Sequence, residues 1–181
     1  MADRTDTNFF EWFDLPVSFL LSEADLRERY LERSRLYHPD FFAGRPPQEQ
    51  QEALQRATLN TRAYETLRDS DRRMRYILEQ FGLLKEEDRQ QMPSDFLMDM
   101  MELNEAVQEA EGAAPEQRQA LRDELNRRMQ LLAAEVADDL QQFRADDEHT
   151  QRLLRIRDYY LKRRYLLRLQ QRLDSFEATR Q

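Results

Sequence analysis

Glycine and proline lie almost entirely between helical patterns in this chain, and this spacing is the strongest restriction on its fold. Gly44, Gly82 and Gly112 each stand where helical apolar periodicity lapses, at positions where a residue that accepts a left-handed backbone ends a helix. The prolines that precede the next helical segments, where a missing N–H costs nothing, are Pro46, Pro47, Pro93 and Pro115. Because β-branched residues are scarce and Leu, Ala, Glu, Gln and Arg dominate, the chain is predicted to be all-α.

The intervals between these breaks predict the helices and the domains. Helices are expected near residues 8–13, 22–37, 48–67, 71–81, 94–110, 115–144 and 149–177. The stretch from Gly82 to Pro93 reads as a boundary, so we expect one domain over 1–81, a linker over 82–93 and a second domain over 94–181. Thirty residues of helix span about 45 Å, so the second domain is predicted to be an elongated three-helix bundle.

The composition argues against several classes of function. The chain has no cysteine, so disulfides, cysteine-based zinc sites and thiol nucleophiles are excluded. This fits a reducing compartment, and a cytoplasmic location is expected. No apolar run reaches about 18 residues and the N-terminus has no signal-peptide core, so no membrane partner is expected. The net charge of −8 argues weakly against nucleic acid as the main partner.

Charge is distributed unevenly along the second half of the chain. Residues 86–111 hold nine acidic residues and one arginine, whereas residues 151–172 hold eight basic residues and one aspartate. Segments of opposite sign indicate either mutual packing or separate partners. The tyrosines among the bases of the last helix resemble a phosphate-binding pattern, but that helix also has a core face, so packing within the bundle is favoured. The core face comprises Leu153, Ile156, Tyr160, Leu166 and Leu173.

The tripeptide His38-Pro39-Asp40 follows an amphipathic, arginine-rich helix. Pro39 disfavours the α-region for His38 and fixes its own φ, so the helix must stop here in a stiff turn. Asp40 can accept backbone N–H groups, and Phe41 and Phe42 are expected to pack underneath. Taken alone, the tripeptide is only a helix stop. No further His or Cys supports a metal site, and no Ser or Thr is placed to use His38 as its base.

The setting of this turn resembles the J-domain of DnaJ-type co-chaperones. The resemblance covers roughly residues 8–78, and its residues are Tyr30, Tyr37, His38, Pro39, Asp40, Asn60, Ala63, Tyr64 and Leu67. It implies that the turn and the basic face of the preceding helix dock on a DnaK-type ATPase chaperone and stimulate ATP hydrolysis. Arg29 and Arg35 lie off the apolar stripe and are the expected basic contacts, against the alternative of ordinary solvated charge. A basic residue usually follows this tripeptide in the family, and here Phe41 does.

The helix expected at 94–110 has more apolar residues than one core stripe can use. Phe96, Met100, Leu103 and Val107 follow helical spacing and predict a packing face. A second face begins with apolar residues and continues with acidic ones; it includes Leu97, Met98, Met101, Glu102, Glu105 and Glu109. Leu and Met outside a core favour a protein partner, and the acids favour a basic one. The alternative is a helix buried on two sides, or acids paired with the basic helix.

A J-domain followed by F-L-M-x-x-M-E-L-x-E and a helical hairpin resembles the HscB-type co-chaperones of iron–sulfur cluster assembly, over almost the whole chain. This resemblance implies two partners, an HscA-type chaperone and the cluster scaffold IscU. By position, the scaffold-binding residues are Leu97, Met98, Met101, Glu102, Glu105 and Glu109, completed by Tyr159, with Tyr160 as the alternative. The cysteine-rich N-terminal extension of some eukaryotic members is absent, so the bacterial type fits better.

The sequence therefore predicts an adaptor that is not an enzyme and uses no cofactor or metal. It holds a scaffold on its second domain and presents that scaffold to a chaperone with its first. A rival hypothesis is a J-domain protein whose bundle binds a different client or mediates oligomerisation. A metal-dependent enzyme is disfavoured because the sequence has no cluster of metal ligands.

Overall fold

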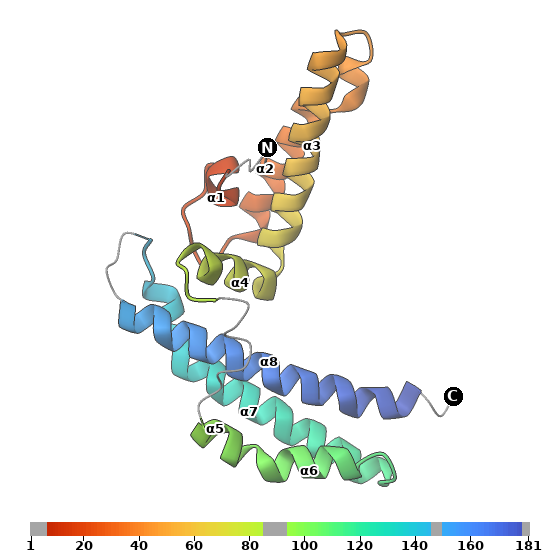
Figure 1. The fold of residues 1–181 in the computed structure, drawn as a ribbon, viewed down its shortest axis with the longest axis vertical. Coiled ribbons are helices and arrows are strands. Elements are labelled where there is room, and N and C mark those ends of the chain that lie inside the picture. The colour runs from red at the N-terminus through yellow and green to blue at the C-terminus, as the bar shows by residue number, and fades with distance from the viewer. Residues whose placement is uncertain (1–6, 85–93, 146–149, 179–181) are drawn as a thin grey trace. The chain divides into compact units, whose positions relative to one another are not determined.

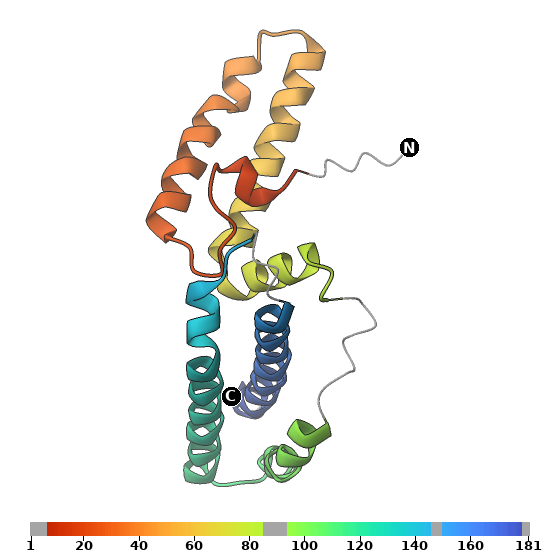
Figure 2. The same ribbon diagram turned by 90° about the vertical axis from the view of Figure 1, so that its left-hand side faces the viewer.

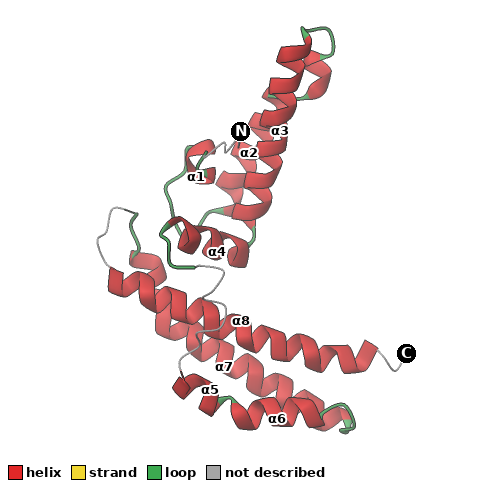
Figure 3. Cartoon of the chain, viewed as in Figure 1, coloured by secondary structure: helices red, strands yellow, loops and turns green. Residues whose placement is uncertain are grey.

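A computed structural model describes residues 7–84, 94–145 and 150–178 of the 181-residue chain. Over these ranges the chain is helical and contains no strand (Figure 3), which confirms the all-α prediction. The helices are α1 (Phe9–Trp12), α2 (Glu23–Leu36), the 3₁₀ helix η1 (Pro39–Phe42), α3 (Pro47–Arg68), α4 (Ser70–Gln80), α5 (Ser94–Asp99), α6 (Met101–Glu109), α7 (Pro115–Gln142) and α8 (Thr150–Ala178). Most of the expected linker, residues 85–93, lies outside the described residues.

The chain divides into two compact units. The first comprises residues 1–77 and 143–147, and the second comprises residues 78–142 and 148–181. The residues that follow α7 thus count with the first unit, where Phe143 packs edge-on against Phe19 with ring centroids 4.8 Å apart.

In the first unit, α2 and α3 form an antiparallel hairpin with η1 in the connection at its tip (Figures 1 and 2). The local signals act as predicted. Ser22 accepts the N–H of Asp25 at the start of α2, the helix ends at Leu36 just before His38 and Pro39, and Pro47 is the first residue of α3. The interior of the unit contains Phe10, Phe13, Leu26, Leu67 and Ile77, each almost completely buried.

A buried amide joins three helices of the first unit. The Oδ1 atom of Asn60 on α3 accepts the indole N–H of Trp12 at 3.0 Å. Its Nδ2 atom donates to the carbonyl of Tyr30 at 3.1 Å and to the hydroxyl of Ser34 at 2.9 Å, both on α2. Because each bond is directional, one amide sets the positions of α1, α2 and α3 relative to one another.

A second buried polar contact attaches α4 to the hairpin. Arg73 donates from Nε to the carbonyl of Phe19 at 3.1 Å, and its Nη1 atom donates to the carbonyl of Leu67 at the end of α3. Burial lowers the pKa of Arg73, an effect that the negative charges of Glu23 and Asp69 oppose. The guanidinium therefore joins α4 to a loop carbonyl and to a carbonyl at the C-terminal end of α3.

The second unit is built on the long antiparallel pair α7 and α8, with α5 and α6 lying alongside (Figure 1). Its core combines residues of all four helices, and the face predicted from spacing is part of it. The core residues are Phe96, Met100, Leu103, Val107, Ala110, Leu125, Leu166, Leu169 and Leu173. At 28 residues, α7 is about 42 Å long, close to the predicted length.

The helix expected at 94–110 is interrupted at Met100. There the backbone has φ −93° and ψ −4°, which divides the segment into α5 and α6. The interruption is slight, because the N–H of Met100 still donates to Phe96 (3.1 Å) and the N–H of Asn104 to Met100 (2.9 Å). The predicted packing face therefore continues across the break.

Candidate functional site

The His38-Pro39-Asp40 turn forms the exposed tip of the α2–α3 hairpin. Pro39 begins η1, and the Nδ1 atom of His38 accepts the backbone N–H of Asp40 at 3.3 Å. The Asp40 carboxylate lies 3.5 Å from the same nitrogen. The fixed φ of Pro39 and this cap hold the imidazole in place, while the side chains of His38 and Asp40 both remain largely exposed to solvent. The tip can therefore present His38 and Asp40 together to another protein.

The expectation that Phe41 packs underneath this turn is wrong. Phe41 is 70% exposed, and its ring meets His38 edge-on with centroids 6.0 Å apart, whereas Phe42 is only partly buried. The reason is the 3₁₀ geometry, in which residues three apart lie above one another on the same side. Phe41 thus shares the exposed side of His38 instead of turning toward α3.

The two candidate basic residues occupy different sides of α2. They are six residues apart, which separates them by about 120° around the helix. Arg35 is exposed and has no ion pair among the residues described. Arg29 lies nearer the core stripe, with its Nη1 atom 3.9 Å from the carboxylate of Asp14. Only Arg35 is fully available to a partner in this structure.

The α5–α6 segment has the second face that its spacing indicates. Leu97, Met98 and Met101 are 40%, 69% and 59% exposed, although Phe96 and Met100 beside them are buried. These three residues form an apolar strip on the solvent side of the bundle. Their exposure excludes burial of this helix on two sides, and their role in binding a scaffold stays a prediction.

The acids beside this strip are also accessible. Glu102, Glu105 and Glu109 are exposed, and within the described part of the chain none of them forms an ion pair with α8. The basic helix uses other partners instead. Arg155 donates two hydrogen bonds to Asp139 of α7, at 2.7 and 2.6 Å, and Arg152 lies 3.6 Å from the same carboxylate. The α6 acids can therefore meet a basic partner.

The Asp139 cluster is a feature that charge counting did not reveal. The hydrogen bonds from Arg155 hold the pKa of Asp139 below its usual value, against the opposing effect of burial. The cluster joins the C-terminal part of α7 to the N-terminal part of α8, so it stabilises the bundle. No sequence signal pairs an aspartate and an arginine sixteen residues apart on two different helices.

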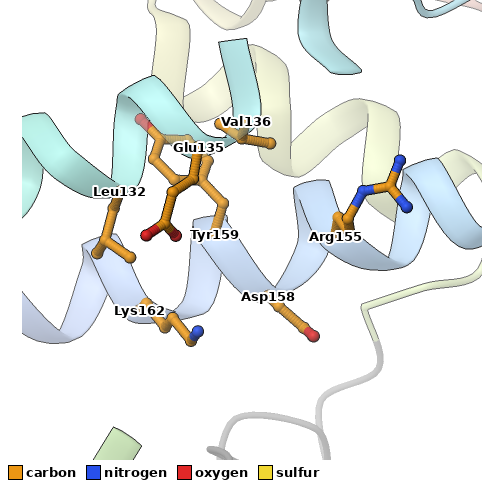
Figure 4. A pocket seen from close by; sticks show the side chains of 7 residues that line it. All are labelled: Leu132, Glu135, Val136, Arg155, Asp158, Tyr159 and Lys162. Carbon is orange, nitrogen blue, oxygen red and sulfur yellow. The ribbon is translucent and has the colours of Figure 1, made fainter. Parts of the chain in front are cut away.

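The two candidate tyrosines of α8 have different environments. Tyr160 is buried, whereas Tyr159 is partly exposed and lines a shallow cavity of about 240 Å³ between α7 and α8. Figure 4 shows Tyr159 beside Glu135 of α7, with Lys162 one turn further along α8. The Lys162 ammonium also lies over the ring of Phe96 in α5, 5.6 Å from its centroid. Of the two tyrosines, Tyr159 is thus the one with solvent-accessible surface.

Comparison with known proteins shows which proteins this chain is similar to. Residues 92–174 match the family model described as the HSCB C-terminal oligomerisation domain. A curated relative, a Co-chaperone protein HscB homolog from Shewanella amazonensis, is 36% identical over 103 residues, which are 56% of this chain and 59% of that protein. These findings confirm the resemblance to HscB-type co-chaperones. The matched segment spans somewhat less than two thirds of that relative's length.

Solved HscB structures share the fold over nearly the whole chain. The chaperone HscB from Vibrio cholerae matches with a TM-score of 0.72 at 25% identity, covering 96% of this chain and 99% of that one. The human co-chaperone protein HscB matches with a TM-score of 0.74 at 25% identity, covering 96% of this chain and 83% of that one. This likeness confirms the predicted fold class, an N-terminal J-domain followed by a helical C-terminal domain.

None of the helices in the described ranges is long and apolar enough to cross a membrane. The same ranges hold no group of three or more His, Asp or Glu side chains placed to bind a metal ion.

Proposed function

We propose that this chain is an adaptor that binds an IscU-type iron–sulfur scaffold and delivers it to an HscA/DnaK-type chaperone. The apolar strip of Leu97, Met98 and Met101 carries this proposal, because a folded domain gains nothing from three adjacent large apolar side chains in water. The likeness of residues 92–174 to the HscB C-terminal family model, and of nearly the whole chain to solved HscB structures, supports the same proposal.

The scaffold contacts that we propose are formed by α5, α6 and one position of α8. Leu97, Met98 and Met101 provide apolar area, and flexible Met side chains adapt to a partner surface. Glu102, Glu105 and Glu109 steer a basic scaffold toward that area, since they have no ion pairs of their own among the residues described. Tyr159 is proposed to complete the surface next to Lys162.

The chaperone contacts that we propose lie at the tip and along α2. His38, Pro39 and Asp40 form a rigid end that needs no ordering on docking, and Arg29 and Arg35 supply positive charge for an acidic chaperone surface. The chain itself catalyses nothing in this scheme. It raises the effective concentration of scaffold at the chaperone, so two weak encounters become one.

The decisive experiment measures ATP turnover by the chaperone. The wild-type chain should raise turnover, and adding scaffold should raise it further. His38→Gln should abolish stimulation while leaving thermal unfolding and scaffold binding unchanged, because the imidazole is exposed and distant in sequence from the strip. Stimulation that survives His38→Gln contradicts the role given to the tip.

A self-associating bundle is the second candidate, because the matched family model is described as an oligomerisation domain. The same apolar strip could then bind a second copy of the chain. Sedimentation equilibrium of the chain alone separates the two functions. A dimer that Met98→Asp dissociates, combined with no binding of scaffold, favours self-association.

A further inference from the structure

Asp14 has a backbone conformation that few residues adopt. It follows α1 and has φ of 51°, the only positive φ of a non-glycine residue in the described ranges. Aspartate and asparagine tolerate this left-handed region better than other side chains, yet it remains unfavourable for them. The turn is fixed by backbone hydrogen bonds from Asp14 to Glu11 (3.0 Å) and from Leu15 to Phe10 (2.9 Å). The direction of the Asp14 side chain is therefore set by the turn.

That direction brings the carboxylate onto the arginines of α2. The Nη2 atom of Arg33 donates to Oδ2 of Asp14 at 2.6 Å, and the Nη1 atom of Arg29 lies 3.9 Å from the same oxygen. Arg33 is additionally held over the Trp12 ring, 5.1 Å from its centroid. One carboxylate thus serves two guanidinium groups on successive turns of the helix.

This contact changes the charge that α2 offers to a partner. Arg29 is one of the two basic residues proposed to dock on the chaperone, and Asp14 supplies a mostly exposed negative charge beside it. A partner that recognises a basic helix face is acidic, so it is repelled by Asp14 and competes with it for Arg29. Arg35 has no such neighbour among the described residues.

We propose that Asp14 limits the affinity of the first unit for its chaperone by holding Arg29 and Arg33 in an intramolecular ion pair. This inference rests on the proposed function. It identifies Asp14 as a residue that weakens docking, whereas the chaperone contacts proposed above favour it. The arginines must then leave Asp14 when they bind the acidic chaperone surface. Because one ion pair is exchanged for another, docking is weaker and more reversible at low salt.

Asp14→Asn tests this idea because asparagine accepts positive φ and removes only the charge. The concentration of the full chain that gives half-maximal ATPase stimulation should fall about threefold at 50 mM salt, the effect of one partly exposed charge pair. The difference should vanish at 500 mM salt, where screening is strong. Glu11→Gln is the matched control, since Glu11 is an exposed carboxylate of α1 with no ion pair in the described part.

The outcomes separate this inference from the function on which it rests. If the wild type stimulates the chaperone in a His38-dependent manner but Asp14→Asn gives unchanged or weaker stimulation, the inference alone is overturned. The inference is also overturned if Glu11→Gln lowers the half-maximal concentration as much as Asp14→Asn does. It is equally overturned if Asp14→Asn lowers that concentration by the same factor in an Arg29→Ala background. If the wild type does not stimulate at all, the proposed function fails and this inference fails with it.

Discussion

Replacing Leu97 and Met101 together by alanine tests the apolar strip most directly. Their exposed fractions, 40% and 59%, together equal about one complete side chain of apolar surface. Burying one such side chain contributes about 1.5–3 kcal/mol, and alanine retains part of it, so the double substitution should cost about 1–2 kcal/mol of binding. The scaffold dissociation constant should therefore rise about 5- to 30-fold.

Isothermal titration calorimetry of the full chain with an IscU-type scaffold measures this change. The substitutions remove atoms that face solvent, so the free energy of unfolding should change by less than about 0.5 kcal/mol. Leu131→Ala is the matched control, because Leu131 lies on α7 of the same unit and is 60% exposed. A change below twofold, or an equal loss of affinity from Leu131→Ala, would refute the assignment of this strip to the scaffold.

Two further predictions concern stability. Asn60→Ala removes three hydrogen bonds and leaves the Trp12 N–H without its acceptor, so the first unit should lose about 2–4 kcal/mol in urea denaturation; a loss below about 1 kcal/mol would contradict the role of the amide. Because the folded pKa of Asp139 lies below its unfolded value of about 3.9, its contribution is present above that pH and is lost as the pH falls through the folded pKa. Asp139→Asn should therefore make the urea midpoint decline less steeply between about pH 5 and 3 than in the wild type, whereas Asp138→Asn should not. If the wild type and both variants show the same decline of urea midpoint with pH, the Asp139 cluster is not its cause.

Much of the fold could be predicted because its boundaries depend on local chemistry. Ser22, Pro47 and Gly82 end or begin helices through their own backbone preferences, so neighbours in space are not needed to place them. The core face of α5 and α6 could also be predicted, because four apolar residues at helical spacing define one side of a helix. The tip was predictable from Pro39 for the same reason.

What the sequence could not supply depends on contacts between distant segments or on small backbone differences. Phe41 is exposed because η1 is a 3₁₀ helix and not a loose turn, a difference of a few tens of degrees in backbone angles. By contrast, the burial of Tyr160 could be predicted, because helical spacing already placed it on the core face of the last helix. In the sequence Asp14 is an ordinary turn residue, and only its positive φ in the structure shows that its side chain faces α2.

The hydrogen bond inside the tip also determines which hydrogen-bonding groups the tip presents to a partner. While Nδ1 of His38 accepts the N–H of Asp40, a neutral imidazole must carry its proton on the opposite ring nitrogen, Nε2. The tautomer is thereby selected before any partner arrives, and the ring points outward as a donor. A docking surface for this tip must accordingly offer an acceptor oxygen to the imidazole and a donor to the neighbouring Asp40 carboxylate.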